Sequence, residues 1–119
     1  MKKTLVIGAS ENQERYSNMA VKLLVKYQHN VIAIGNKTGN INGVEIIVGM
    51  PDLKEIDTVT LYINPKFQEA YYNFIISLKP KRIIFNPGTE NIKLMELAEQ
   101  KGIAAIVACT LVMLKTGQY

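Results

Sequence analysis

Short, mostly apolar runs alternate along this chain with segments whose apolar residues recur at helical spacing. The runs cover residues 5–7, 31–34, 44–48, 58–63, 83–85 and 104–108, and most of them stop at a glycine or an asparagine. A short apolar run bounded by turn residues is typical of a strand buried on both faces of a sheet. Strands that alternate with helices pair in parallel, with the helices on both faces. The pattern predicts an α/β fold: a Rossmann-like, doubly wound and mainly parallel sheet of five to six strands.

Three of the intervening segments are expected to form helices. The first has Ser17 as its N-cap and an apolar stripe at Met19, Ala20, Leu23, Leu24 and Tyr27. The second has Asn64 as its cap, Pro65 at its first position and a stripe at Phe67, Ala70, Tyr71, Phe74, Ile75 and Leu78. The third runs from about Asn91 to Gln100, buries Ile92 and Met95 with Leu94 and Ala98 as further candidates, and ends at Gly102.

The remaining segments are expected to be shorter. Single helical turns are expected at residues 52–55 and 111–114, and the Asn- and Gly-rich segment 36–43 is expected to be a loop. This loop is too short to hold a crossover helix, so the direction of the strand at residues 44–48 is left open.

Length and composition restrict the class of protein. The 119 residues suit one domain over the whole of 1–119, and the apolar content of 48% is enough for a core. The apolar start of the chain is too short for a signal peptide, no stretch is long enough to span a bilayer, and the lone Cys109 excludes an intrachain disulfide. The cytoplasm is the simplest compartment. Lys and Arg exceed Asp and Glu by 14 to 10, which suits an anionic ligand, but no basic run marks a nucleic-acid groove.

The segment after the first strand is the strongest candidate for a phosphate site. Gly8 permits a tight turn, and the small residues Ala9 and Ser10 let a pyrophosphate approach the backbone. The dinucleotide fingerprint asks for three glycines, and here only the first is present. Arg15 follows in the same loop, and a guanidinium matches phosphate geometry. An ordinary strand-to-helix turn with a solvated arginine remains the alternative.

The end of the second strand argues against NAD. An NAD site usually places Asp or Glu there to bind the ribose hydroxyls, whereas this chain has Gly35, Asn36 and Lys37. A lysine suits a phosphorylated ribose, as in NADP or at the 3′-phosphate of coenzyme A. A lysine on a surface loop is the alternative.

No catalytic or metal-binding set is apparent. The single histidine, His29, precedes the second strand, at the end of the sheet away from the expected ligand, and Asp52, Glu55 and Asp57 lie at that end as well. Cys109 follows the last strand, where a lone cysteine is more often buried packing than a nucleophile. No catalytic residue and no metal ligand are therefore predicted.

Several segments together resemble the stand-alone coenzyme A-binding proteins, which are relatives of the nucleotide-binding domain of succinyl-CoA synthetase α-subunits. The resemblance covers almost the whole chain and rests on the order and spacing of Val6–Ser10, Glu14–Ser17, Val31–Lys37, Gly43–Glu45, Ile56–Val59, Tyr62–Pro65 and Cys109.

The resemblance implies a role for each part of the site. Gly8, Ala9, Ser10 and Arg15 would hold phosphates, with Tyr16 and Ser17 beside them; Asn36 and Lys37 would meet the adenosine end, and Ile63, Asn64 and Pro65 would flank the cofactor.

The chain also departs from the family pattern. No proline follows Asn36, Asn86-Pro87-Gly88 replaces a single glycine after the fifth strand, and Val107-Ala108 replaces a charged pair before Cys109. The domain that carries the phosphohistidine of the synthetases is not part of this sequence.

The function expected from the sequence is a non-catalytic module that binds coenzyme A or an acyl-CoA. The alternative is an NADP-type or other nucleotide-dependent enzyme or regulator that completes its site with a partner subunit; a third reading is a pure interaction domain without a ligand. The expected partner is a small-molecule nucleotide cofactor, with neither nucleic acid nor membrane, and a partner protein or a homo-oligomer is left open.

Overall fold

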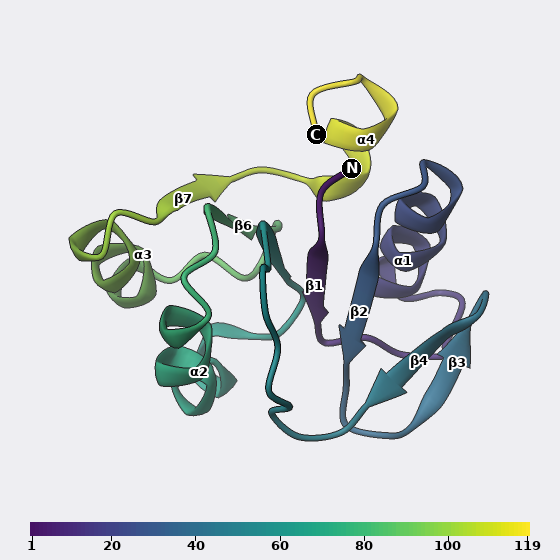
Figure 1. Cartoon of the computed structure of the whole chain (residues 1–119), viewed down its shortest axis with the longest axis horizontal. Helices are drawn as coiled ribbons and strands as arrows, with labels where there is room; N and C mark the ends of the chain where they lie inside the picture. The colour runs from purple at the N-terminus through teal and green to yellow at the C-terminus, as the bar shows by residue number, and fades with distance from the viewer.

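A single seven-stranded sheet forms the centre of the molecule, in the order β3-β4-β2-β1-β5-β6-β7 (Figure 1). The computed structural model describes all 119 residues. The strands are β1 (Thr4–Ile7), β2 (Val31–Ile34), β3 (Gly39–Ile41), β4 (Val44–Ile47), β5 (Thr58–Leu61), β6 (Arg82–Phe85) and β7 (Ala104–Val107). All neighbours pair in parallel except β3 and β4, which are antiparallel. The fold is therefore α/β and Rossmann-like, as predicted.

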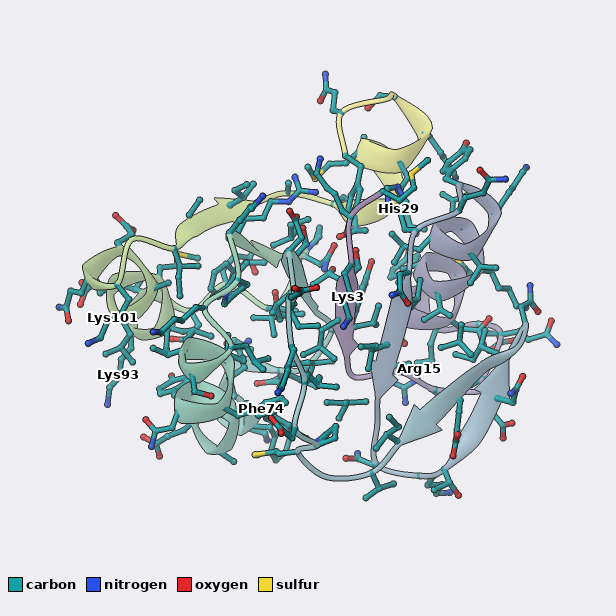
Figure 2. All side chains as sticks on the ribbon, in the orientation of Figure 1. Lys3, Arg15, His29, Phe74, Lys93 and Lys101 are labelled. Atoms are coloured by element: carbon teal, nitrogen blue, oxygen red, sulfur yellow. The ribbon has the colours of Figure 1, made fainter.

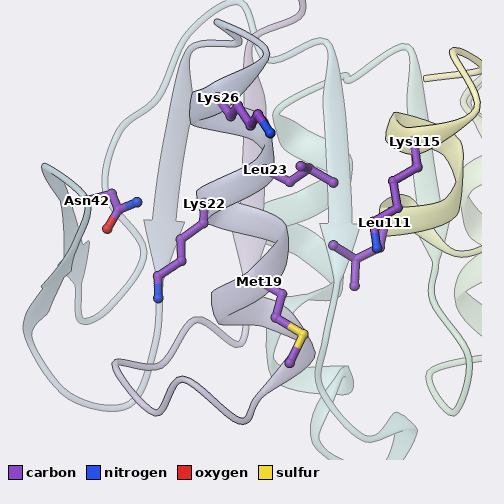
Figure 3. Close-up of a pocket in the computed structure, with 7 residues that line it drawn as sticks. All are labelled: Met19, Lys22, Leu23, Lys26, Asn42, Leu111 and Lys115. Carbon is purple, nitrogen blue, oxygen red and sulfur yellow. The ribbon is translucent and has the colours of Figure 1, made fainter.

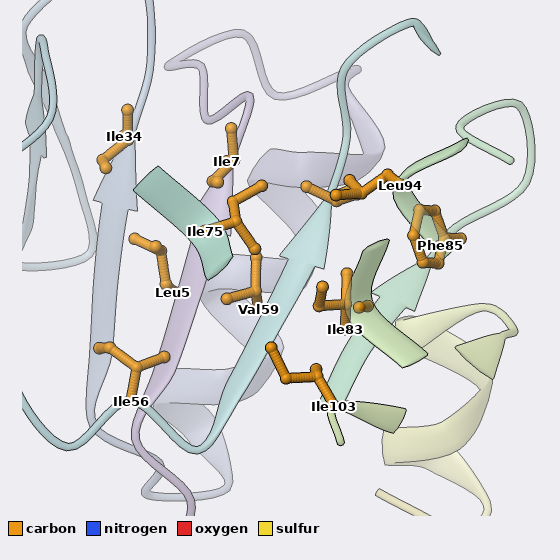
Figure 4. Close-up of a cluster of buried hydrophobic side chains, with 12 residues drawn as sticks. Leu5, Ile7, Ile34, Ile56, Val59, Ile75, Ile83, Phe85, Leu94 and Ile103 are labelled. Atoms are coloured by element: carbon orange, nitrogen blue, oxygen red, sulfur yellow. The ribbon is translucent and has the colours of Figure 1, made fainter. Parts of the chain in front are cut away.

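Helices cover both faces of this sheet. They are α1 (Tyr16–Lys26), the 3-10 turns η1 (Pro65–Phe67) and η2 (Glu69–Tyr71), α2 (Tyr72–Ser77), α3 (Ile92–Gln100) and α4 (Thr110–Lys115). On one face α2 and α3 contribute Ile75, Leu94 and Ala98 to the larger core cluster (Figure 4). On the other face α1 and α4 contribute Val21, Leu24 and Leu114 to the second cluster. None of the helices is long and apolar enough to cross a membrane.

The central strands consist mostly of apolar residues because helices cover both faces of the sheet there. All four residues of β1 and of β5 are buried. The parallel register aligns Ile7 with Ile34, with Leu61 and, through Leu61, with Phe85. The loops after these strands consequently emerge together at one edge of the sheet, where ligands bind in open α/β folds.

One strand of the sheet was not predicted. Residues 36–43 were expected to be a loop, but Gly39–Ile41 forms β3 and pairs with β4 across a two-residue turn at Asn42 and Gly43. Both turn residues have positive φ, at 48° and 90°, as a type I′ hairpin turn requires. The strand count is therefore seven rather than five to six. The hairpin also explains how so short a connection leaves β4 parallel to β2.

The helix predicted after Asn64 is interrupted. Asn64 does cap the segment, accepting a hydrogen bond from the Lys66 N–H, but only 3-10 turns follow until α2 begins at Tyr72. Phe67 is 62% exposed instead of buried, and the neighbouring Gln68 is completely buried in its place. The Gln68 side chain binds two backbone carbonyls, and this polar contact overrides the apolar stripe.

Smaller differences concern helix ends and burial. The turn expected at residues 52–55 does not form, and α1 begins one residue before Ser17, with Arg15 as its N-cap. Ile92, expected in the core, is 74% exposed because it is the first residue of α3 and lies on its outer side.

The chain ends meet at the amino-terminal edge of the sheet. The Tyr119 hydroxyl lies 2.5 Å from the Thr4 hydroxyl, and Arg82 donates to the Tyr119 carbonyl at 2.7 Å while covering its ring. The His29 ring packs edge-on against the Tyr119 ring, and His29 Nδ1 accepts a hydrogen bond from the Lys2 N–H. Figure 2 shows His29 at this end and Arg15 toward the other, as predicted.

His29 is expected to make the protein less stable in mild acid. Partial burial lowers the pKa of His29 from its ordinary value, and the positive charges of the N-terminus and Lys2 lower it further. Between the folded pKa and the unfolded value of about 6.5, the unfolded chain binds more protons, so stability falls as the pH drops through this window. We expect the urea-unfolding free energy of His29→Gln to change less between pH 7 and pH 5 than that of the parent. If the unfolding free energies of the variant and the parent change equally with pH, the prediction is wrong.

Candidate functional site

A cavity of about 270 Å³ opens at the carboxyl-terminal edge of the sheet. Its walls come from the end of β1, the start of α1 and the loops after β5 and β6. The lining residues are Gly8, Arg15, Tyr16, Ser17, Tyr62, Ile63, Asn64, Pro87, Gly88 and Thr89. Six of these were singled out from the sequence, namely Gly8, Arg15, Tyr16, Ser17, Ile63 and Asn64. The structure thus brings together two predicted segments that lie about fifty residues apart in the chain.

Gly8 lets two of the cavity walls approach closely. Its φ of 101° is in the region that glycine tolerates, and a Cβ placed there would lie 2.6 Å from the Tyr62 carbonyl oxygen. The same Cβ would lie 3.0 Å from the Ile63 side chain. A glycine is therefore needed here both for its backbone conformation and for its small size.

The free hydrogen-bond donors of the first loop differ from those that the sequence indicated. The N–H groups of Gly8 and Ala9 both donate to the Ile34 carbonyl at 2.9 Å, so they brace the turn. The N–H groups of Tyr16 and Ser17, in the first turn of α1, have no acceptor within the protein, and the Arg15 side chain does not cap the helix. Unpaired donors at the positive end of an eleven-residue helix form a favourable place for an anion.

Arg15 is the only charged side chain that lines the cavity. It is exposed, and no carboxylate in the protein lies within ion-pair distance of it. Its guanidinium is therefore free to bind a phosphate next to the Tyr16 and Ser17 N–H groups.

A buried asparagine, Asn18, holds the first loop in place. Its amide donates to the Ser10 carbonyl at 2.9 Å, and within the loop the Ser10 hydroxyl accepts from the Asn12 N–H. Ser10 thus supports the loop without lining the cavity. The sequence does not mark Asn18 as a site residue, because its position inside a helix conceals its contact with the loop.

A second buried amide, Gln68, joins the two loops that form the opposite wall. It donates to the Ile63 carbonyl at 3.0 Å and to the Thr89 carbonyl at 2.8 Å. Its own oxygen accepts from Asn91, which also donates to the Tyr72 hydroxyl. The contacts of Gln68 with Thr89 and Asn91 link residues more than twenty positions apart, so no local sequence pattern marks them.

Asn86 connects the sheet to α4 below the cavity. Its amide nitrogen donates to the Thr60 hydroxyl at 2.7 Å and to the Leu61 carbonyl at 2.9 Å. Its amide oxygen accepts from the Thr110 N–H at 2.8 Å, and the hydroxyls of Thr60 and Thr110 bind each other. Asn86 is buried and uses its side chain entirely within the protein, while Pro87, Gly88 and Thr89 face the cavity.

Tyr62 supplies a hydroxyl group behind the cavity wall. This hydroxyl is buried and has no hydrogen-bond partner. Burial raises the pKa of the Tyr62 phenol well above its ordinary value, and nearby Cys109 adds to the increase. The phenol therefore stays protonated and cannot act as a base. Cys109 itself is partly buried and does not line the cavity.

The other predicted residues lie outside the cavity. Ala9 is buried beneath the turn, Pro65 begins η1, and Asn36 and Lys37 are exposed at the end of β2. The first loop does reach their segment, because Glu11 accepts a hydrogen bond from the Asn40 N–H at 2.9 Å. The assignment of Asn36 and Lys37 to a bound ligand stays a prediction.

These residues fit a cofactor that carries a pyrophosphate. Two unpaired helix N–H groups and one unpaired arginine converge on a cavity whose other walls are glycine, proline and uncharged side chains. No cluster of three or more His, Cys, Asp or Glu side chains suited to a metal ion is present. The donor set therefore matches phosphate oxygens rather than a cation.

Comparisons with solved structures show that other proteins share this fold. A crystal structure described only as that of an uncharacterized protein is 49% identical, with a TM-score of 0.97 over 100% of this chain and 98% of the other. A Thermus thermophilus protein is 16% identical, with a TM-score of 0.86 over 99% of this chain and 90% of the other. A hypothetical protein from Pyrococcus horikoshii OT3 is 23% identical, with a TM-score of 0.86 over 97% and 82% of the two chains. These last two likenesses show the fold alone.

Comparison with protein families gives the remaining result. No curated protein matches the chain. Residues 2–115 match the family described as "CoA binding domain", which is nearly the whole chain. By this match, the protein belongs to the family of CoA binding domains.

Proposed function

We propose that the protein binds coenzyme A or an acyl-CoA at the carboxyl-terminal edge of its sheet and does not itself catalyse a reaction. The observation that carries this proposal is the convergence of Arg15 with the free N–H groups of Tyr16 and Ser17 on one cavity. In this arrangement the pyrophosphate would lie at the start of α1, and the backbone turn at Gly8 would leave room for it. Membership of the CoA binding domain family supports the choice of coenzyme A over other nucleotides.

The side chains that line the cavity support a binding role. They include no carboxylate, imidazole or thiol, and the Tyr62 phenol is held protonated by burial. A general base or a nucleophile would therefore have to come from the ligand or from a partner protein.

A thermal melt with three cofactors tests the proposal. Coenzyme A should stabilise the protein by about 2.7 kcal/mol at roughly a hundredfold excess over its dissociation constant, because it binds only the folded state. NAD should give a smaller shift, since no acidic residue follows β2 to bind its ribose. A larger shift with NADP than with coenzyme A would favour the alternative, a nucleotide-dependent enzyme or regulator. No shift with any of the three would support an interaction domain without a ligand.

Arg15→Ala should weaken coenzyme A binding about ten- to hundredfold. A charge-assisted hydrogen bond contributes roughly 1.5–3 kcal/mol, and here the arginine has no competing partner in the protein. The stability of the free protein should hardly change, because the side chain is exposed. Calorimetry on the parent and the variant gives both the affinity for coenzyme A and the stability of the free protein. If the variant binds like the parent, the phosphates lie elsewhere.

Lys37→Ala should weaken binding less, and only for a ligand with a 3′-phosphate. A flexible ammonium on an exposed loop stays largely solvated, so its contribution is smaller than that of Arg15. With dephospho-CoA the loss should disappear. Lys101→Ala, at the distant end of α3 (Figure 2), serves as the charge-matched control. An equal loss with both ligands would remove Lys37 from the 3′-phosphate.

A further inference from the structure

A second cavity, of about 560 Å³, lies on the face of the molecule that α1 and α4 cover. It is lined by Met19, Lys22, Leu23, Lys26, Asn42, Leu111 and Lys115. Figure 3 shows Leu23 extending from α1 toward α4, with Leu111 of α4 further down and Met19 below both. We call the part between the two helices the α1–α4 groove. Its floor is apolar, and it opens to solvent.

The α1–α4 groove begins next to the cavity of about 270 Å³ at the carboxyl-terminal edge of the sheet, which we call the cofactor cavity. Tyr16, Met19, Leu23 and Lys26 are spaced three, four and three residues apart, so they follow one another along a single face of α1. Tyr16 lines the cofactor cavity, and Met19, the next residue on this face, lines the groove. A chain that leaves the cofactor cavity past Tyr16 would therefore meet Met19 and then Leu23.

Two lysines border the groove, one from each helix. Lys26 is in the last turn of α1 and Lys115 in the last turn of α4. In Figure 3 the Lys26 side chain extends toward α4, and that of Lys115 runs back along α4 toward Leu111. Neither forms an ion pair, and no acidic residue lines the cavity. Lys22 extends to the opposite side of α1, toward Asn42, and does not join this pair.

We propose that the α1–α4 groove holds the acyl chain of an acyl-CoA whose far end is a carboxylate. The methylene groups would lie on Met19, Leu23 and Leu111, and the terminal carboxylate would meet Lys26 and Lys115. This inference rests on the proposed function, because the chain enters from the cofactor cavity.

The spacing along the helix selects chains of medium length. Met19 and Lys26 are seven residues apart, which corresponds to about 10 Å along the helix axis. A two- or three-carbon acyl group would end before the lysines. Six- to eight-carbon chains with a terminal carboxylate are therefore the expected ligands, and a plain fatty acyl group would leave both ammonium groups without a partner.

Calorimetry with matched ligands tests this directly. We would compare coenzyme A, hexanoyl-CoA, octanoyl-CoA, adipoyl-CoA and suberoyl-CoA, because the last two add a terminal carboxylate to the six- and eight-carbon chains. Each dicarboxylic ligand should bind about three- to tenfold more tightly than its plain counterpart. The factor is modest because both lysines are exposed, and it should shrink as salt is added.

Three variants assign the effect to the groove. The double variant Lys26→Ala/Lys115→Ala should remove the preference for the dicarboxylic ligands and leave the affinity for coenzyme A unchanged. Lys22→Ala removes one positive charge from another side of α1 and should keep the preference. Leu111→Asn should weaken all four acyl-CoA ligands relative to coenzyme A.

The outcomes separate this inference from the proposed function. If coenzyme A itself fails to bind, the proposed function is wrong and the groove loses its ligand with it. If coenzyme A binds but all five ligands have equal affinity, the cofactor assignment stands and the groove inference is overturned. A preference that survives the double lysine variant, or that Lys22→Ala abolishes, overturns it as well.

Discussion

Replacing Gly8 by alanine is expected to lower the free energy of unfolding by about 2–5 kcal/mol. A side chain at φ 101° costs about 1–2 kcal/mol in backbone strain. The new Cβ would also lie 2.6 Å from the Tyr62 carbonyl oxygen, and relieving such an overlap costs a further 1–3 kcal/mol or so. Because the wall at Tyr62 and Ile63 must move, the affinity for coenzyme A should fall as well. Urea unfolding and calorimetry give the two values.

Gly49→Ala is the matched control for this substitution. Gly49 has a φ of 103°, almost the same as that of Gly8, but an added Cβ there would meet nothing within 4 Å. It should therefore cost only the backbone strain, about 1–2 kcal/mol, and leave ligand binding intact. If the two variants lose the same stability, the close approach at Tyr62 has no energetic consequence.

Asn86→Ala is expected to lower the free energy of unfolding by about 3–5 kcal/mol. The substitution removes three buried hydrogen bonds and leaves the Thr110 N–H and the Leu61 carbonyl without their Asn86 partner. Each buried group left unsatisfied costs about 1–3 kcal/mol. The start of α4 should loosen first, because the Thr110 N–H is its link to β6. Hydrogen exchange at α4 would report this loosening, and chemical denaturation the total.

Thr60→Val provides the comparison within the same network. It removes one acceptor of the Asn86 amide, which keeps its bond to the Leu61 carbonyl, and it also removes the bond between the Thr60 and Thr110 hydroxyls. The expected loss is about 1–3 kcal/mol. The two substitutions together should cost less than the sum of the single losses, since they share one hydrogen bond. Strict additivity, or a loss below 1 kcal/mol for Asn86→Ala, would show that the network contributes little.

Those parts of the fold that rest on local patterns could be predicted from the sequence. The apolar runs that became β1, β2 and β5 mark strands buried on both faces, and the parallel sheet follows from their alternation with helices. β3 could have been found too, because Asn42-Gly43 between Ile41 and Val44 is a strong hairpin signal. The many Asn and Gly residues around it hid that signal, since they also suit a loop.

The residues of the candidate site also fall into two groups, those that a local pattern marks and those that it does not. Gly8, Arg15 and Ser17 follow one strand directly, so the topology alone brings them to the ligand edge. Gln68 could not be found, because its partners lie in two loops that meet only in the folded chain. The apolar stripe through Phe67 predicted that Phe67 faces the core, but Gln68 is buried there instead. A stripe reflects only hydrophobicity and gives no sign of a buried amide that binds backbone carbonyls.

The two ends of the chain lie close together beside His29. Thr4 and Tyr119 touch at the edge of the sheet opposite the cofactor cavity, and Figure 1 shows both ends there. A short flexible linker would therefore suffice to join them, and new ends could be opened at the exposed turn of Asn42 and Gly43. Such a circular permutant would separate Thr4–Ile7 from the start of the chain while leaving every lining residue of the cofactor cavity in place. It would make the order in which the strands are synthesised an experimental variable, with cofactor binding as the measure of correct folding.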